Sequence, residues 1–359
     1  MFPISDHAPC SLWRKSRSDF FQRLLLHTPT SRSLPPAITM AIEYISLNIL
    51  CRFSTPAFLP TFKGSTLRGA FGHALKKVAC ALKNQECQSC LLAKSCAYGL
   101  IFATEKLSGG RMSARPHPYV LNPPVTEQQQ YKQNENLTFN LVLLGPAASF
   151  LPHIVYAVEE MGKTGVGSGT KTGDGRFDLQ AISTSTDASK EKPVVLYEER
   201  NKTLQTPLQL PRLDLDDSKA DGVRELAINL VTPLRIKEEN RLQGQISFLS
   251  LTRAALRRVT LMEEHYGNGE LKLDYQDLIQ QALAIQTSSQ NVRWHEYKRY
   301  SNRQKQSMLF GGLTGRMHFQ GNLSPFLPLF NYCRHINLGK QTAFGLGKIR
   351  VTALQHADS

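Results

Sequence analysis

Apolar and polar residues alternate strictly over residues 42–49, which is the spacing of a β-strand with one buried face. Apolar residues then recur at the spacing of one helical face, at Leu67, Phe71, Leu75 and Val78. We therefore expect a helix over residues 64–78, capped by Ser65 or Thr66. The elements expected after it are a strand over 137–144, a helix over 149–161, a glycine loop over 162–169 and a strand over 176–182.

The same order of elements starts again after residue 223. The second series comprises a strand over 226–230, a helix over 247–266, a strand or hairpin over 307–319, a helix over 323–337, a glycine loop over 339–347 and a strand over 348–354. A repeated order of this kind predicts an α+β fold with two tandem ferredoxin-like (RRM-like) domains.

The expected boundaries follow from this repeat. The N-terminal domain is expected over residues 40–183, a polar linker over 184–223 and the C-terminal domain over 224–359. Residues 1–39 contain Ser and Pro without clear periodicity. They are interpreted either as an extension without ordered structure or as a misassigned start, with Met40 as the true first residue.

The charge balance indicates a polyanionic partner. The chain carries 43 Lys and Arg against 29 Asp and Glu, which gives a formal net charge of +14. Each phosphate that a cation neutralises releases condensed counterions, so this surplus favours binding to RNA. The alternative is a basic soluble protein without such a partner. A membrane surface is less favoured because no basic amphipathic helix of the interfacial kind is visible.

The apolar runs of the chain are short. No run reaches the roughly 18 residues that a membrane-spanning helix needs. The run over residues 24–26 is too short for the core of a signal peptide. The sequence therefore predicts a cytoplasmic protein with no membrane partner, and its motifs indicate no small-molecule substrate.

A glycine-rich loop precedes the last predicted strand of each half. Glycine permits positive φ and leaves backbone N–H groups uncovered, so a phosphate backbone can approach. The segment Gly162-Lys163-Thr164 resembles the end of a P-loop, but position 157 is not Gly and a predicted helix precedes the loop. Neither loop fits the dinucleotide fingerprint. The loops are thus not mononucleotide sites; ordinary glycine-capped turns are the alternative to RNA contact.

The second loop, residues 339–348, and the helix start at residues 64–70 resemble the RAMP superfamily of CRISPR-associated proteins, as does the doubled ferredoxin-like order. Residues 299–304 and 311–315 strengthen the similarity to the pre-crRNA processing endoribonucleases of that superfamily. The resemblance spans residues 40–355. Non-cleaving relatives, which cap or line CRISPR effector complexes, share the motif at the helix start.

Cations and aromatic residues interleave over residues 291–305, where five Lys and Arg face a single acid. Cations can hold phosphates while rings stack on unpaired bases, so this pattern suits RNA. The alternative is a solvated strand edge whose aromatic residues pack inward. Across the chain, the candidate RNA-binding residues are Arg68, Arg253, Arg257, Arg293, Arg299, Arg303, Lys340, Thr342 and Lys348.

Four of the seven cysteines lie within one short segment, at Cys80, Cys87, Cys90 and Cys96. Four thiolates satisfy tetrahedral zinc, and the spacing of Cys87 and Cys90 is that of a zinc knuckle. The sequence therefore predicts a structural zinc in an insert of the first domain. An iron–sulfur cluster is the alternative ligand, and unliganded cysteines are the third interpretation.

The resemblance implies RNA cleavage that needs no metal. The ribose 2′-OH attacks the adjacent phosphorus and leaves a 2′,3′-cyclic phosphate and a 5′-OH. This reaction requires a base, an acid and cations around the phosphorane. Histidine suits the proton transfer near neutral pH.

The resemblance also places the base on or near the first helix of the first domain, where His73 lies. Lys76 and Lys77 follow at helical spacing and are candidates to stabilise the phosphorane. The reserve candidates are His335, His318 and His295, with Tyr98 or Tyr44 as assisting groups. The alternative for His73 is an ordinary packed or surface residue of the helix, with the base elsewhere. The main rival to the endoribonuclease is a non-cleaving RAMP subunit that binds crRNA with other effector subunits. A general two-module RNA-binding protein is the third hypothesis.

Overall fold

The computed structural model describes most of the chain after residue 40. The described ranges are residues 41–83, 85–107, 115–184, 193–205, 209–213, 215, 220–238, 241–242, 245–267, 273–301 and 306–354. The expected extension over residues 1–39 and the candidate Arg303 lie outside these ranges.

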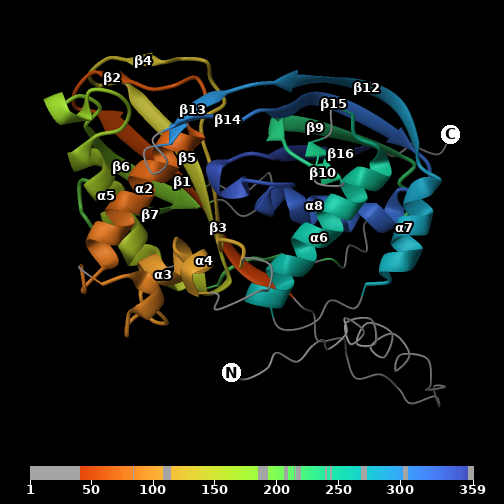
Figure 1. Ribbon diagram of the computed structural model, residues 1–359, viewed down its shortest axis with the longest axis horizontal. Coiled ribbons are helices and arrows are strands. Elements are labelled where there is room, and N and C mark those ends of the chain that lie inside the picture. The colour runs from red at the N-terminus through yellow and green to blue at the C-terminus, as the bar shows by residue number, and fades with distance from the viewer. Residues whose placement is uncertain are drawn as a thin grey trace, which may run out of the picture. The chain divides into compact units, whose positions relative to one another are not determined.

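The N-terminal half is built on one antiparallel sheet. Its strand order is β3-β5-β1-β6-β7, and a short strand, β8, pairs with β1. The strands are β1 (Ile42–Phe53), β3 (Tyr119–Asn122), β5 (Asn136–Leu144), β6 (Phe177–Thr184), β7 (Val194–Glu198) and β8 (Arg212–Leu213). Two helices, α2 (Gly64–Ala79) and α5 (Leu151–Thr164), lie side by side against this sheet (Figure 1).

The C-terminal half contains a second antiparallel sheet with the order β12-β15-β9-β16. Its strands are β9 (Glu225–Leu234), β12 (Gln286–His295), β15 (Gly312–Gln320) and β16 (Ile349–Leu354), and its helices are α6 (Phe248–Tyr266), α7 (Tyr275–Leu283) and α8 (Leu327–Ile336). A hairpin of β13 (Lys298–Ser301) and β14 (Gln306–Leu309) extends from β12 and β15. The two sheets correspond in their strand order. Strand β1 lies between β5 and β6 in the first sheet, as β9 lies between β15 and β16 in the second.

The remaining described elements are short. They are β2 (Ala57–Phe58), β4 (Gln130–Tyr131), β10 (Lys237–Glu238), β11 (Arg241–Leu242), α3 (Ala97–Ile101), α4 (Thr104–Leu107) and 3₁₀ turns at Cys87–Ser89, Gly145–Phe150, Thr170–Thr172, Ser324–Phe326 and Thr342–Phe344. No helix among the described residues has both the length and the apolar character that crossing a bilayer requires.

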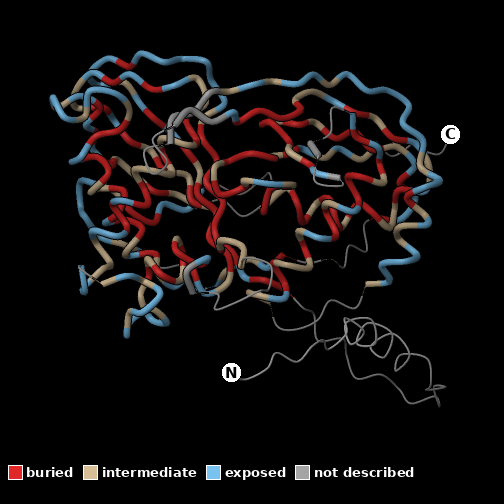
Figure 2. The backbone as a smooth tube through the Cα atoms, viewed as in Figure 1, coloured by how far each residue is buried: buried red, intermediate tan, exposed pale blue. Residues whose placement is uncertain are grey.

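Each half has its own apolar cluster, each cluster includes residues from the other half, and buried stretches run through both halves (Figure 2). Ile42 and Tyr44, at the start of β1, belong to the cluster of the C-terminal half, whereas Ala343 belongs to that of the N-terminal half. A buried hydrogen bond also crosses between them, because Asn337 Nδ2 donates to Asn122 Oδ1 at 3.0 Å. The two halves therefore form one compact unit rather than two separate domains.

The structure confirms the α+β class and the antiparallel sheets that the sequence predicts. The expected cap of α2 is wrong, because the cap residue is Lys63 and no side chain caps the helix. Lys63 is fully buried, and its ammonium group donates to the carbonyls of Thr61 at 3.2 Å and Thr126 at 3.1 Å. The bond to Thr126 ties the helix start to a distant loop, but it supplies no acceptor for the N–H groups of the first turn.

The interpretation of residues 184–223 as a plain linker is also wrong in part. Strand β7 extends the first sheet at its edge, and β8 pairs with the start of β1. Strand β3 lies in the Pro-rich passage for which the sequence predicts no element, and α7 is likewise unexpected. The strands are short and gain their order from neighbouring segments, so local periodicity does not identify them. Helix α7 does have local signals, because Asp274 caps it and Leu278, Ile279 and Ala282 recur at helical spacing, and the sequence interpretation missed them.

Candidate nucleic-acid interface

The start of α2 and the C-terminal glycine loop are in direct contact. A Cβ added at Gly64 would stand 1.9 Å from the carbonyl oxygen of Phe344, so only glycine fits there. On the other side of the loop, Gly345 has a φ of +83°, and a Cβ there would lie 2.3 Å from Pro123 Cδ. The two motifs that carry the sequence resemblance, one from each half, therefore meet in space.

Arg68 joins these segments through its guanidinium group. Its central carbon lies 4.4 Å from the ring centre of Phe102 and 4.3 Å from that of Phe344. One terminal nitrogen also bonds to His117 Nε2 at 3.2 Å. Cation–π contacts of this kind are strongest where the cation is partly desolvated. The predicted RNA-binding residue Arg68 is thus engaged within the protein, between α2 and the glycine loop.

His117 is held as a neutral imidazole. Its Nε2 accepts from Arg68, so we assign its proton to Nδ1, which lies 3.1 Å from Thr104 Oγ1. The threonine hydroxyl in turn donates to the Arg115 carbonyl at 3.3 Å. Burial, followed by the charges of Arg68 and Arg258, lowers the His117 pKa to about 4. No spacing in the sequence distinguishes His117 from the other histidines.

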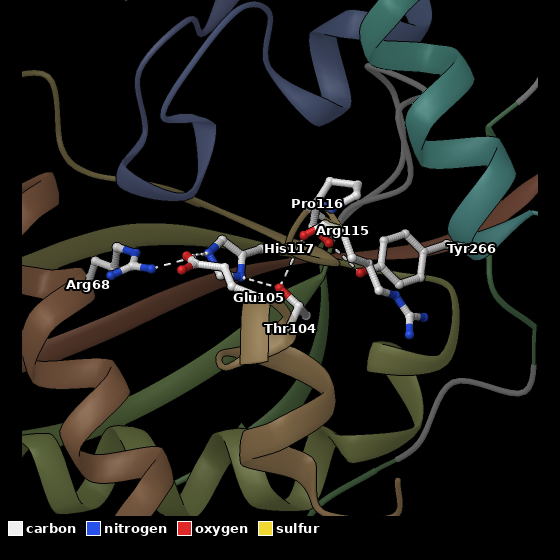
Figure 3. Close-up of polar contacts among 7 residues, drawn as sticks. All are labelled: Arg68, Thr104, Glu105, Arg115, Pro116, His117 and Tyr266. Carbon is white, nitrogen blue, oxygen red and sulfur yellow. Dashed lines mark hydrogen bonds and ion pairs between the residues drawn. The ribbon is translucent and has the colours of Figure 1, made fainter. Parts of the chain in front are cut away.

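These contacts continue to the C-terminal half. Figure 3 shows the series running from Arg68 through His117 and Thr104 to the segment of Arg115 and Pro116, which meets Tyr266 of α6. The Tyr266 hydroxyl donates to the Pro116 carbonyl, and the Arg115 guanidinium lies 4.7 Å from the Tyr266 ring centre. Residues 115–117 therefore connect α2 to α6.

His73 lies further along α2 on its exposed face. It borders a shallow depression of about 270 Å³, whose other lining residues are Lys76, Lys77, Cys80 and Lys83. The structure thus brings together His73, Lys76 and Lys77, as the sequence predicts, and no carboxylate is among the residues that line the depression. This arrangement offers a titratable imidazole beside several cations.

The two lysines differ in their partners. Lys77 Nζ lies 2.5 Å from Glu160 Oε1 on α5, and this contact is the main reason that the Glu160 pKa is lowered. The ammonium group of Lys76 lies 5.9 Å from the ring centre of Tyr98. Because the charge of Lys77 is largely compensated by Glu160, Lys76 is the better placed of the two to meet a phosphate.

The other candidate histidines are placed differently. The ring of His335 packs on Tyr44 with 4.8 Å between ring centres, and that of His295 packs on Tyr297 at 4.3 Å. His318 is half-buried on β15. Tyr44 is 4% exposed, which removes its hydroxyl from a surface substrate. The lining of the His73 depression includes none of these residues.

A second basic surface lies at α6 and the C-terminal glycine loop. Arg253 and Arg257 are exposed one turn apart on α6, and Lys340 is exposed on the loop. Burial lowers the Lys340 pKa, and the nearby charges of Lys237 and Arg257 lower it further. A cluster of like charges is unfavourable in the free protein, so an anionic ligand would relieve it.

The remaining RNA-binding candidates are less uniform. Arg293 is exposed on the edge strand β12, whereas Lys348 is half-buried and burial lowers its pKa. Thr342 is 7% exposed, so the structure places its side chain in the interior, contrary to a surface contact with RNA. Arg299 lies on β13, but its side chain is outside what the structure describes.

The predicted metal ligands are not gathered into a site. The described cysteines form no disulfide, and the Cys96 thiol points to the carbonyl of Ala79 at 3.8 Å. In the part of the chain that the structure describes, no three His, Cys, Asp or Glu residues are arranged to hold one metal ion. This geometry does not fit the tetrahedral zinc predicted from Cys80, Cys87, Cys90 and Cys96, which stays a prediction.

Two parts of the chain match models of known protein families. The family model for the CRISPR-associated endoribonuclease Cas6 matches residues 228–349. A further model, described as an N-terminal domain, matches residues 41–209. A protein of Archaeoglobus fulgidus described as "Uncharacterized protein" is 27% identical over 298 residues, which cover 82% of this chain and 92% of that protein.

Two solved structures share the fold. Thermus thermophilus Cas6 superposes with a TM-score of 0.50 at 11% identity, covering 87% of this chain and 99% of the other. A partial Cas6-RT-Cas1–Cas2 complex gives 0.52 at 10% identity and covers 90% of this chain. This chain spans 48% of the chain matched in that complex, about half its length. At such identities the likeness concerns the fold.

Proposed function

Because this chain is a CRISPR-associated protein of the RAMP type related to the Cas6 processing proteins, we propose that it binds CRISPR repeat RNA and cuts precursor crRNA as a metal-independent endoribonuclease. We also propose that its fold consists of two ferredoxin-like modules. This arrangement is supported by the matching strand orders of the two sheets.

The proposed reaction is an internal transesterification. His73 takes the proton from a ribose 2′-OH, whose oxygen then bonds to the adjacent phosphorus. The bond from phosphorus to the 5′ oxygen breaks, and that oxygen receives a proton from water. The hydroxide left behind takes the proton that His73 holds, which restores the free base. Lys76 stabilises the charge of the phosphorane that forms before the bond to the 5′ oxygen breaks. The products are a 2′,3′-cyclic phosphate and a 5′-OH.

One observation carries this proposal: His73 borders a depression with three lysines and without a carboxylate in the lining. Lysines can attract the phosphate backbone, while an exposed imidazole can exchange protons with solvent between turnovers. His117 is a weaker candidate, since its pKa of about 4 makes it a poor base and its Nε2 already accepts from Arg68. The bonds of His117 to Arg68 and Thr104 indicate that it orients the Arg68 guanidinium group.

A second candidate function is a non-cleaving RAMP subunit that holds crRNA with other effector subunits. The observation that favours it is the basic surface of Arg257 and Lys340, which lies on the other half and needs no proton transfer to bind RNA. One of the similar structures is a complex that also contains Cas1 and Cas2. Protein partners of a CRISPR complex are therefore part of this alternative.

The test is incubation of the protein with end-labelled repeat RNA in EDTA. The endoribonuclease predicts a cut in the repeat, with a cyclic phosphate on the upstream fragment and a 5′-OH on the downstream fragment. A 2′-deoxy substitution at the scissile nucleotide should block the cut because it removes the nucleophile. RNA that is bound but stays intact would instead support the non-cleaving subunit.

A further inference from the structure

A shallow apolar groove separates α6 and α7 in the C-terminal half. Its volume is about 410 Å³, and Leu256 of α6 and Ile279 of α7 form part of its walls. Tyr275, at the start of α7, lines the groove and is 37% exposed. Its hydroxyl lies 2.6 Å from Thr260 Oγ1 of α6, which fixes the ring beside the groove. An aromatic ring held in this manner is a platform on which a flat group can stack.

Cations stand at the rim of this apolar groove. Arg253 and Arg257 line it one helical turn apart, and both are exposed. The charge of Arg257 also helps to lower the pKa of Lys340, so positive charge continues from the groove to the C-terminal glycine loop. The ligand that fits is therefore flat and apolar in one part and anionic in another.

The two acids that flank Tyr275 are occupied at the start of α7. Asp274 Oδ1 accepts the backbone N–H of Asp277 at 2.9 Å, and Asp277 Oδ2 accepts from the Gln281 side chain at 2.6 Å. Neither carboxylate is among the residues that line the groove. Glu264, the exposed acid of α6, does not line the groove either, and among the described residues no carboxylate forms an ion pair with Arg253 or Arg257.

We propose that this groove binds one unpaired nucleobase of the RNA, stacked on Tyr275, with an adjoining phosphate held by Arg253 and Arg257. A base edge and its ribose fill a groove of this size, and an arginine pair supplies the fork that a phosphate accepts. A protein segment with apolar side chains alone would leave the two exposed arginines without an anion. The inference rests on the proposed binding of repeat RNA and names one nucleotide subsite within it.

The test combines protein variants with abasic RNA. Equilibrium affinity is measured for repeat RNAs in which one nucleotide at a time lacks its base, against the wild type, Tyr275→Ala and the matched control Tyr275→Phe. Base stacking on an aromatic ring predicts that Tyr275→Ala weakens binding roughly 5- to 150-fold. Tyr275→Phe keeps the ring and should bind nearly as the wild type does.

The decisive result is coupling at one nucleotide. One abasic position should weaken binding to the wild type and to Tyr275→Phe, but should have no further effect on Tyr275→Ala. If the wild type binds repeat RNA and no position shows this coupling, the groove is not a nucleotide subsite, although the proposed function stands. If the wild type binds no RNA at all, the proposed function fails and the subsite with it.

Discussion

The guanidinium carbon of Arg68 lies 4.3 Å from the ring centre of Phe344, which links the first helix of the N-terminal half to the glycine loop of the C-terminal half. The same guanidinium also bonds to His117, whose chain segment reaches α6. The loop is therefore positioned by side chains from both halves. A substitution of Arg68 should therefore alter the position of the glycine loop more than it alters cleavage at His73.

Replacing Arg68 tests this link. Arg68→Gln removes a cation stacked between two rings and should lower the free energy of unfolding by about 1–2 kcal/mol. In a double-mutant cycle with Phe344→Leu, the two losses should fall short of additivity, since each removes the same contact. Denaturant unfolding measures both quantities, and Arg253→Gln, which changes an exposed arginine, serves as the control. Strictly additive losses would contradict an Arg68–Phe344 interaction.

The buried His117 predicts a dependence of stability on pH. Its pKa is lowered from 6.5 to about 4 in the folded protein, so between these values the unfolded chain binds more protons. Stability from this residue is therefore complete above pH 6.5 and is lost as the pH falls toward 4, by up to about 3 kcal/mol. Unfolding midpoints across this range measure the effect. The slope should be smaller in His117→Gln; equal slopes would show that His117 does not titrate as described.

Local patterns predicted the elements whose own sequence carries a buried face. In α2, the apolar positions Leu67, Phe71 and Leu75 are buried, and β1 runs from the predicted start at Ile42. Strand β3 escaped prediction because it lies among prolines, and all four of its residues are buried by the strands and helices around it. Its order comes from pairing with β5, a contact that no local window contains.

The same distinction applies to the site. The neighbourhood of His73 and Lys76 follows from helical spacing, so the sequence was sufficient to place them together. The contacts of His117 and Tyr266 form only when α2, α4 and α6 meet, and no spacing anticipates them. Thr342 was expected at the surface, yet it is buried because its loop packs against the start of α2 and against β3.

Binding of repeat RNA should depend steeply on salt. If Arg257 and Lys340 each hold one phosphate of a single strand, the logarithm of the affinity should fall linearly with that of the salt concentration, at about −0.7 per contact. Arg257→Gln and Lys340→Gln together should reduce the magnitude of this slope by about 1.4. Arg200→Gln is a matched control, because Arg200 pairs with Glu198 at 2.8 Å. An affinity that does not change with salt would contradict the basic surface.

Metal analysis tests the cysteine segment. The four thiols predict about one zinc per purified chain, and Cys87→Ser with Cys90→Ser should lower that content. Visible absorbance with bound iron would instead favour an iron–sulfur cluster. Protein that contains neither metal would contradict the prediction, in agreement with the geometry, in which the described residues gather no three metal ligands.

His73 is proposed as the base of a metal-independent cut. Single-turnover cleavage of labelled repeat RNA in EDTA measures it most directly, with His73→Ala compared with the wild type. The matched control is His153→Ala, which removes a half-buried histidine from α5. We expect His73→Ala to cut about 10²–10⁴-fold more slowly with nearly unchanged RNA affinity, and the control to cut normally. Cleavage by His73→Ala at the wild-type rate would contradict the account.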